Sequence, residues 1–254
     1  MGVTLDQWLI LGVAALLVGI TKTSISGLGT IVVTLFAFVF PAKESTATSL
    51  FLLMAGDVLA VALYSRQADW KLIRSLLPAV VPGIVVGAVF MHFVDNKVML
   101  IGIGACIGLT LIVQAIVSLR EAHGPAPAPD ATPNRALTMG TGVMAGFVTL
   151  VGNAAAAVMS LYLLATHTDK MRFVASAAWF YCIVNLVKVP FIVALGIVNW
   201  HHVLVLSTLV PLTVVSGLLG KRFLTRLNQK QFERITLVMT IIACITLLVR
   251  GFLA

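Results

Sequence analysis

The apolar run over residues 7–40 is interrupted in its middle by a polar, glycine-rich stretch, residues 21–30, which reads TKTSISGLGT. A second long run, residues 136–166, is interrupted at residues 149–154, which read TLVGNA. Each run is too long for one ordinary bilayer crossing, which takes roughly 20 apolar residues, and too short for two crossings with a loop. Each run is therefore either one tilted and kinked span or a re-entrant hairpin of two shorter helices that returns to its starting side.

The composition of the chain indicates that lipid is its solvent. Of its 254 residues, 60% are hydrophobic and only 10% are charged, whereas a soluble domain carries about 25% charged residues. Six further apolar runs occupy residues 45–65, 72–94, 98–119, 172–198, 203–224 and 232–252. The sequence therefore predicts an all-α, polytopic membrane protein.

Several function classes are excluded by what the sequence lacks. The formal charge of +8 comes from basic residues that lie singly or in pairs between apolar runs, and not from a stripe that could bind nucleic acid. The three cysteines, Cys106, Cys182 and Cys244, lie inside apolar runs without metal-ligand spacing. The sequence contains no nucleophile–base pair, phosphate-binding loop or dinucleotide-binding motif, so we expect neither an enzyme nor a metal or other cofactor. Residues 1–6 lack Lys and Arg, which argues against a cleaved signal peptide.

A Pro/Ala-rich polar linker, residues 121–135, divides the chain into two transmembrane halves, residues 1–120 and 136–254. A shift of 127 residues aligns Lys43 with Lys170, and a shift of 130 aligns Trp70 with Trp200. A shift of 133 aligns Pro78, Gly87, Phe90 and Lys97 with Pro211, Gly220, Phe223 and Lys230. The shift drifts in one direction, as expected for two diverged copies with short insertions, so the sequence predicts an internal duplication.

The distribution of basic residues distinguishes the two topologies. Lys22 and Lys188 lie within apolar runs, which leaves 15 of the 17 Lys and Arg residues near span ends. With single kinked spans, these residues divide nine to six between the two sides of the membrane. With re-entrant hairpins, 12 lie on one side and only Lys43, Lys97 and Arg250 lie on the other. Because cytoplasmic loops are enriched in Lys and Arg, we predict hairpins.

Two hairpins make the predicted halves inverted copies of each other. Each half then contains a hairpin and three full transmembrane helices, an odd number of crossings, so the second half lies upside down relative to the first. Inverted repeats with broken helices are a common architecture of secondary transporters. The linker would be cytoplasmic, and both termini would lie on the non-cytoplasmic side of the cell (inner) membrane.

Polar residues at the two hairpin tips are the first candidates for a binding site. Ser26 and Asn153 are equivalent at the shift of 127, and both residue types favour the N-cap of a helix. Free backbone N–H groups and the positive dipole end of a helix suit an anion. Two such tips near the membrane midplane would form one anion site with approximate two-fold symmetry. The alternative is that both stretches are only kinks packed against neighbouring helices.

Three ionisable side chains lie deep within apolar runs. Lys188 follows Asn185 by three residues, which places both on one helix face, and Pro190 loosens the helix beside them. Lys22 lies in the first break, where it would either face a substrate or snorkel to the surface. Asp57 could neutralise a lysine in the empty site, pair structurally with Lys188, or carry a coupled proton or cation.

Three stretches of the sequence are similar to motifs of one transporter family. They are Gly19–Gly29 (GITKTSISGLG), Asn153–Leu164 (NAAAAVMSLYLL) and Ala177–Pro190 (AAWFYCIVNLVKVP). Through them the chain resembles the sulfite exporter TauE/SafE family, also called TSUP transporters, over nearly its whole length. The positions that match the family's motifs are Lys22, Asn153, Asn185 and Lys188, whereas Ala154–Ala157 replace a glycine cluster found in many members. The resemblance implies export of sulfite, sulfonates or related oxyanions, or movement of an organic acid.

These patterns together predict a secondary transporter that exports a small anion, sulfite or an organosulfonate, by alternating access. Its partners would be the anion, the lipid bilayer and a possible second copy of the chain. An anion channel or a carboxylate transporter of the same architecture is the alternative. The candidate substrate-binding residues are Lys22, Thr23, Ser24, Ser26, Gly27, Gly152, Asn153, Asn185 and Lys188. Asp57 is the candidate coupling residue.

Overall fold

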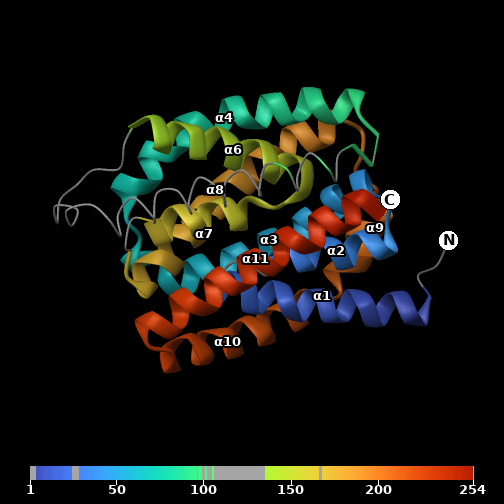
Figure 1. The fold of residues 1–254 in the computed structure, drawn as a ribbon. Coiled ribbons are helices and arrows are strands. Elements are labelled where there is room, and N and C mark those ends of the chain that lie inside the picture. Colours follow the sequence, from blue (N-terminus) through green and yellow to red (C-terminus); the bar gives the residue numbers. More distant parts are fainter. Residues whose placement is uncertain are drawn as a thin grey trace.

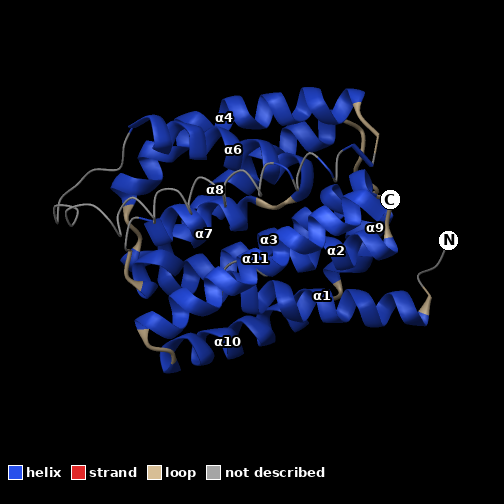
Figure 2. Ribbon diagram, in the orientation of Figure 1, coloured by secondary structure: helices blue, strands red, loops and turns tan. Residues whose placement is uncertain are grey.

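Helices make up the regular structure of the part of the chain that the computed structural model describes, which is residues 4–24, 29–95, 97–98, 101, 105, 135–165 and 168–253 (Figure 2). These helices are α1 (Leu5–Thr23), α2 (Gly29–Val39), α3 (Ala42–Tyr64), α4 (Trp70–Phe93), α6 (Arg135–Gly152), α7 (Ala155–Ala165), α8 (Lys170–Ala194), α9 (Trp200–Ser207), α10 (Val210–Arg226) and α11 (Gln229–Leu253). A 3-10 turn over Ser65–Gln67 follows α3. The candidates Ser26 and Gly27, nearly all of the linker and most of the predicted span over residues 98–119 lie outside the described residues.

Within the described residues, four helices are long and apolar enough to cross a membrane by themselves, namely α1, α3 with its 3-10 turn, α4 and α8. A fifth candidate is the pair α9–α10, which is bent by 52° between the two helices. The predicted span over residues 203–224 is therefore a candidate span that contains a break. The first broken run also differs from the prediction, because α1 has 19 residues and already meets the length of a full span.

Polar side chains cap the starts of several helices. Thr4 and Gln7 form a capping box at α1, in which the Thr4 N–H donates to Gln7 Oε1 at 3.0 Å. The side chains of Asp69, Asp169 and Asn199 accept backbone N–H bonds at the starts of α4, α8 and α9. Each cap satisfies donors that a helix start leaves free and stabilises the helix by typically about 1 kcal/mol.

Two tightly packed helix pairs flank the centre of the bundle. In Figure 1, α4 and α6 lie along one edge, α1 and α10 lie along the opposite edge, and the other labelled helices lie between them. One buried apolar cluster joins α4, α6, α7 and α8 to α3, and a second joins α1 and α2 to α3. α3 thus contacts both clusters. Large apolar side chains such as Val86 and Leu204 are exposed on the outside, as expected of helices that lipid covers.

Glycines allow both flanking pairs to pack with their backbones in contact. A Cβ atom added at Gly19 in α1 would lie 2.0 Å from Ser216 Oγ and 2.2 Å from Thr213 O in α10. A Cβ atom added at Gly146 in α6 would lie 2.1 Å from Val80 O in α4. Small residues at a crossing let membrane helices approach closely enough for van der Waals contact to hold them together.

The chain reverses direction at both breaks (Figure 1). α1 runs parallel to α10, since Thr213 donates to the carbonyl of Ala15 and Thr23 donates to the carbonyl of Gly217. α3 begins beside α9, at the end of the bundle where α1 starts, so α2 has carried the chain back. In the same way α6 runs parallel to α4, and α8 begins beside the start of α4.

The contact of Gly19 with α10 predicts a position-specific effect of one methyl group. We expect Gly19→Ala to lower the stability of the protein by about 1–3 kcal/mol, because the methyl group would overpack the α1–α10 crossing. Gly12→Ala, in the same helix, is the matched control, since an added Cβ there meets nothing within 4 Å. Thermal unfolding in detergent measures both variants, and equal melting temperatures would contradict the packing role of Gly19.

Candidate functional site

The second break is built around Asn153, whose backbone lies in the left-handed region with φ of 51°. Asn is the residue type other than Gly that best tolerates this conformation. The Asn153 N–H still bonds to Thr149 O at 3.0 Å, so α6 closes normally, and the Ala154 N–H then reaches back to Val148 O at 3.2 Å. α7 starts at Ala155, so Ala154 directly precedes it. The prediction that Asn153 is the N-cap of the next helix is therefore wrong, because Asn153 directly follows the last residue of α6 and Ala154 stands between it and α7.

The side chain of Asn153 joins the break to α3 and α8. Its Nδ2 donates to Thr46 O at 2.8 Å and to Ser49 Oγ at 2.9 Å, both in α3. Thr46 Oγ1 donates in turn to Val151 O at 3.1 Å. Asn153 Oδ1 accepts a hydrogen bond from Lys188 Nζ in α8. The amide therefore fixes the end of α6 against two of the predicted membrane spans.

Lys188 lies fully buried at the C-terminal end of α6. Its Nζ donates to Thr149 O at 2.9 Å, to Thr149 Oγ1 at 3.2 Å and to Asn153 Oδ1. A cation at this end of a helix is stabilised by the carbonyl groups of the last turn, which carry the negative end of the helix dipole. Lys188 thus meets the second break, and in this conformation its donors are used by protein oxygen atoms.

Lys22, Asp57 and Asn185 form the second part of the site. Lys22 Nζ lies 2.5 Å from Asp57 Oδ1, and Asn185 Nδ2 donates to Asp57 Oδ2 at 2.5 Å. The exposed fractions of the Lys22 and Asp57 side chains are 8% and 1%, so the ion pair is almost dry. Gly56 makes room for it, because a Cβ atom there would lie 2.9 Å from Lys22 Cγ. The Tyr181 ring covers Lys22, with Nζ 4.8 Å from the ring centroid.

The two parts meet on one face of α8, where Asn185 and Lys188 are one turn apart. The sequence predicted that Asn185 and Lys188 share one helix face, and the hydrogen bonds of the two side chains agree with that prediction. Asp57 pairs directly with Lys22 and Asn185, and Lys188 instead bonds to the α6 break. We call Lys22, Asp57, Asn153, Asn185 and Lys188 the buried charge cluster. It joins α1, α3 and α8 to the break between α6 and α7, and its polar groups are closed off from water.

The hydroxyl groups of Thr23 and Ser24, at the end of α1, bond to backbone carbonyl groups in this conformation. Thr23 Oγ1 lies 2.9 Å from Gly19 O and 2.7 Å from Gly217 O, and Ser24 Oγ donates to Ile20 O at 2.7 Å. These are bonds to carbonyl groups inside helices, since Ile20 O also accepts the Ser24 N–H at 2.9 Å and Gly217 lies in the middle of α10. Neither hydroxyl has a hydrogen bond to a residue of the buried charge cluster among the described contacts. The remaining candidate, Gly152, is the buried last residue of α6.

Sequence reasoning missed three residues that hold the cluster together, namely Thr46, Ser49 and Thr149. Thr46 and Ser49 belong to a run of small hydroxyl residues at the start of an otherwise apolar helix, and their spacing of three puts them on one face. That pattern was the available signal. Thr149 was quoted as part of the second break, but nothing in its spacing indicates that its carbonyl binds Lys188.

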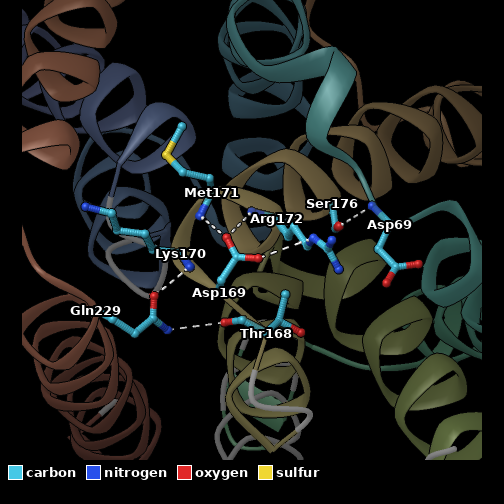
Figure 3. A network of polar contacts seen from close by, with 8 residues as sticks. All are labelled: Asp69, Thr168, Asp169, Lys170, Met171, Arg172, Ser176 and Gln229. Carbon is cyan, nitrogen blue, oxygen red and sulfur yellow. Dashed lines mark hydrogen bonds and ion pairs between the residues drawn. The ribbon is translucent and has the colours of Figure 1, made fainter. Parts of the chain in front are cut away.

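A separate polar network lies at the start of α8, as Figure 3 shows. The Asp69 N–H donates to Ser176 Oγ at 2.9 Å, which joins the start of α4 to α8. The Lys170 N–H donates to Gln229 Oε1 at 2.7 Å, which joins the start of α8 to α11. Asp169 caps α8 and pairs with Arg172 at 3.3 Å, although both side chains are more than half exposed. This network fixes where α8 begins.

Two surface grooves flank the ends of the bundle. The first has a volume of about 650 Å³ and lies between residues 66–70 and the start of α8. The second has a volume of about 540 Å³ and lies between the start of α3 and residues 196–200. The first groove is lined by two acidic residues, Asp69 and Asp169, and by two basic residues, Arg66 and Arg172, so it has no net formal charge. Among the described residues, no group of three or more His, Cys, Asp or Glu side chains could hold a metal ion.

Comparison with known proteins gives one match. The family model described as Sulfite exporter TauE/SafE matches residues 11–247. No curated protein and no solved structure matches the chain. The matched range includes both breaks and every residue of the buried charge cluster, and it confirms the family that the sequence motifs indicated.

The left-handed conformation of Asn153 predicts different costs for two truncations. Both Asn153→Gly and Asn153→Ala remove the amide bonds, but only alanine also adds a Cβ penalty of roughly 1–2 kcal/mol at positive φ. We therefore expect Asn153→Ala to be the less stable variant. Thermal unfolding of the two proteins in the same detergent measures the difference. Equal stability, or a more stable alanine variant, would contradict the backbone role.

Proposed function

The chain belongs to the TauE/SafE sulfite exporter family, and from this premise we propose that it exports sulfite or an organosulfonate by alternating access. Members of the family are membrane transporters and not enzymes, and the chain is a multi-pass membrane protein. The family implies an anionic substrate. The observation that supports the proposal most is the buried charge cluster, because two ammonium groups deep in a membrane are expensive and have a clear use in holding an anion.

Access to the site requires movement of the two breaks. Lys188 is fully buried and Lys22 is 8% exposed, so a substrate cannot reach either ammonium in the conformation described. An anion would replace the neutral oxygens of Thr149 and Asn153 around Lys188. This exchange would loosen the end of α6. The transmembrane potential would assist export, since moving one charge is worth about 2.3 kcal/mol per 100 mV.

We also propose that the two halves, residues 1–120 and 136–254, are inverted repeats. Asp57 and Asn185, which hydrogen-bond to each other, are 128 residues apart, close to the shift that aligns the halves. The α1–α10 pair corresponds to the α6–α4 pair at the same shifts, and Gly19 and Gly146 occupy the matching crossings. The two grooves correspond as well, because residues 66–70 align with residues 196–200 at a shift of 130. Each contact between the halves thus recurs with the two halves exchanged. A two-fold axis in the membrane plane produces such a pattern.

The proposed orientation places the linker in the cytoplasm and both termini outside. The α3–α4 turn, the start of α8 and the α10–α11 turn lie at one end of the bundle and carry most of the basic residues of the described chain. Lys43 lies at the other end, where α3 starts, and Figure 1 draws the start of α1 and the end of α11 at that end too. The positive-inside rule assigns the basic end to the cytoplasm.

Two alternatives use the same architecture. An anion channel would give single-channel conductance far above the turnover of a carrier, which planar-bilayer recording measures. A carboxylate transporter would be stabilised by short organic acids and not by sulfonates. The dry surroundings of Asp57 and Lys188 favour a carrier, because a channel needs a continuous wet path. The homodimer that the sequence allowed stays a prediction.

Removal of the Lys188 ammonium should abolish transport. We expect Lys188→Met to reduce sulfite efflux from proteoliposomes to the level of protein-free vesicles, because the variant retains much of the side-chain volume but not the charge. Lys71→Met is the matched control, since Lys71 is exposed at the start of α4, and it should keep wild-type flux. Thermal unfolding verifies that both variants are folded. Wild-type flux in a folded Lys188→Met protein would remove this residue from the mechanism.

The orientation can be tested with single cysteines in a background without the native ones. A cysteine at Gln67 lies at the proposed cytoplasmic end, and a cysteine at Lys97 lies beyond the opposite end of α4; both positions are exposed. We expect a membrane-impermeant maleimide to label Lys97→Cys in intact cells, and to label Gln67→Cys only after the membrane is opened. The reverse pattern would invert the proposed topology.

A further inference from the structure

Only a few charged side chains determine the net charge of the membrane-spanning interior of the protein. Away from span ends, the apolar runs of the sequence contain three acidic or basic side chains, Lys22, Asp57 and Lys188. In the structure all three belong to the buried charge cluster. Their protonation states therefore set the net charge that the protein holds inside the membrane.

The polar contacts of the three side chains agree with ionised forms of all three. Three oxygen acceptors surround Lys188 Nζ, namely Thr149 O, Thr149 Oγ1 and Asn153 Oδ1. An ammonium group has three N–H donors and can bond to all three oxygens, whereas a neutral amine can do so only if the Thr149 hydroxyl donates to its lone pair. Asp57 forms an ion pair with the Lys22 ammonium through Oδ1 and accepts an amide N–H bond from Asn185 at Oδ2, an arrangement that suits an ionised carboxylate. Two positive charges and one negative charge leave a net charge of +1.

The two lysines differ in what balances them. Lys22 lies against its own counter-ion, Asp57, which Asn185 holds in place from the opposite side. Lys188 bonds to a carbonyl, a hydroxyl and an amide oxygen, none of which carries a formal charge. The uncompensated positive charge of the interior is therefore that of Lys188.

We propose that this single uncompensated charge makes the transporter selective for monovalent anions. The inference rests on the proposed function and narrows its substrate class. A monoanion at Lys188 brings the interior to zero net charge. A dianion leaves one negative charge unbalanced where water is excluded, and an unbalanced charge in a membrane is strongly unfavourable. Sulfonates without a second ionisable group are monoanions at neutral pH, and sulfite would be carried as hydrogen sulfite.

Methanesulfonate and sulfate provide a matched pair of probes for the wild-type protein. Both are tetrahedral and of similar size, and they differ by one methyl group in place of one charged oxygen. Binding is measured from the thermal stabilisation of purified protein over a concentration series. We expect methanesulfonate to bind roughly a hundredfold more tightly than sulfate, the order expected for one unbalanced charge in a membrane.

The outcomes of this comparison separate the two proposals. Binding of sulfate as tight as or tighter than binding of methanesulfonate overturns the monovalent selectivity and leaves anion transport standing. Binding of neither probe, nor of sulfite, overturns the proposed function itself. Preference for methanesulfonate supports both proposals.

Changing the charge count should change the preferred probe. Asp57→Asn leaves two uncompensated ammonium groups, and we expect its preference to move at least about tenfold towards sulfate. Adding Lys22→Gln to this variant restores the single charge of Lys188, so the double variant should prefer methanesulfonate again. An unchanged preference in folded Asp57→Asn, or a sulfate preference in the folded double variant, overturns the proposal. If neither variant folds, the binding of methanesulfonate and sulfate to the wild-type protein still tests the proposed selectivity.

Discussion

The burial of the Lys188 ammonium without a formal counter-charge is the constraint on which the rest of the structure depends. A cation inside a membrane needs an acceptor for each N–H, and the free carbonyl groups at a helix end provide acceptors and a favourable dipole. α6 therefore has to end at Gly152, within reach of α8. Asn153 provides the turn and one more acceptor, and Thr46 and Ser49 in α3 hold its amide in place. The break in α6 is thus a binding arrangement for a lysine and not only an irregularity of packing.

The sequence identified most of the residues of this arrangement, but it did not predict which of them bond to each other. Asn185 and Lys188 were placed on one face because helical spacing alone decides it. The partner of Asp57 could not be predicted, since either lysine satisfies a carboxylate and only the packing of α1 against α3 selects Lys22. Asn153 was expected to start a helix and instead directly follows the end of one. Asn favours both an N-cap and the left-handed conformation, so residue type could not distinguish the two.

The bent pair α9–α10 illustrates a second limit of sequence reasoning. Pro78 and Pro211 align at a shift of 133, yet Pro78 lies inside the continuous helix α4 and Pro211 lies at the start of α10. A proline removes one N–H donor in both places, so it does not explain the difference. The second half has two adjacent hydroxyl residues ahead of its proline, Ser207 and Thr208, whose side chains bond to carbonyl groups three residues back. Such local bonds compete with helix continuation, and the first half has only Ser75 at the matching place.

If Lys188 binds the substrate as proposed, the way it is held also connects substrate binding to conformational change. A ligand shifts a conformational equilibrium only through a difference in its affinity for the two states. In the described conformation the oxygens of Thr149 and Asn153 occupy the ammonium, so an anion binds well only where they have moved away. Their departure frees the end of α6 and the turn that leads into α7. In the proposed mechanism, the same contacts that stabilise the empty site therefore also make it respond to an anion, because the substrate and the helix end would compete for one charge.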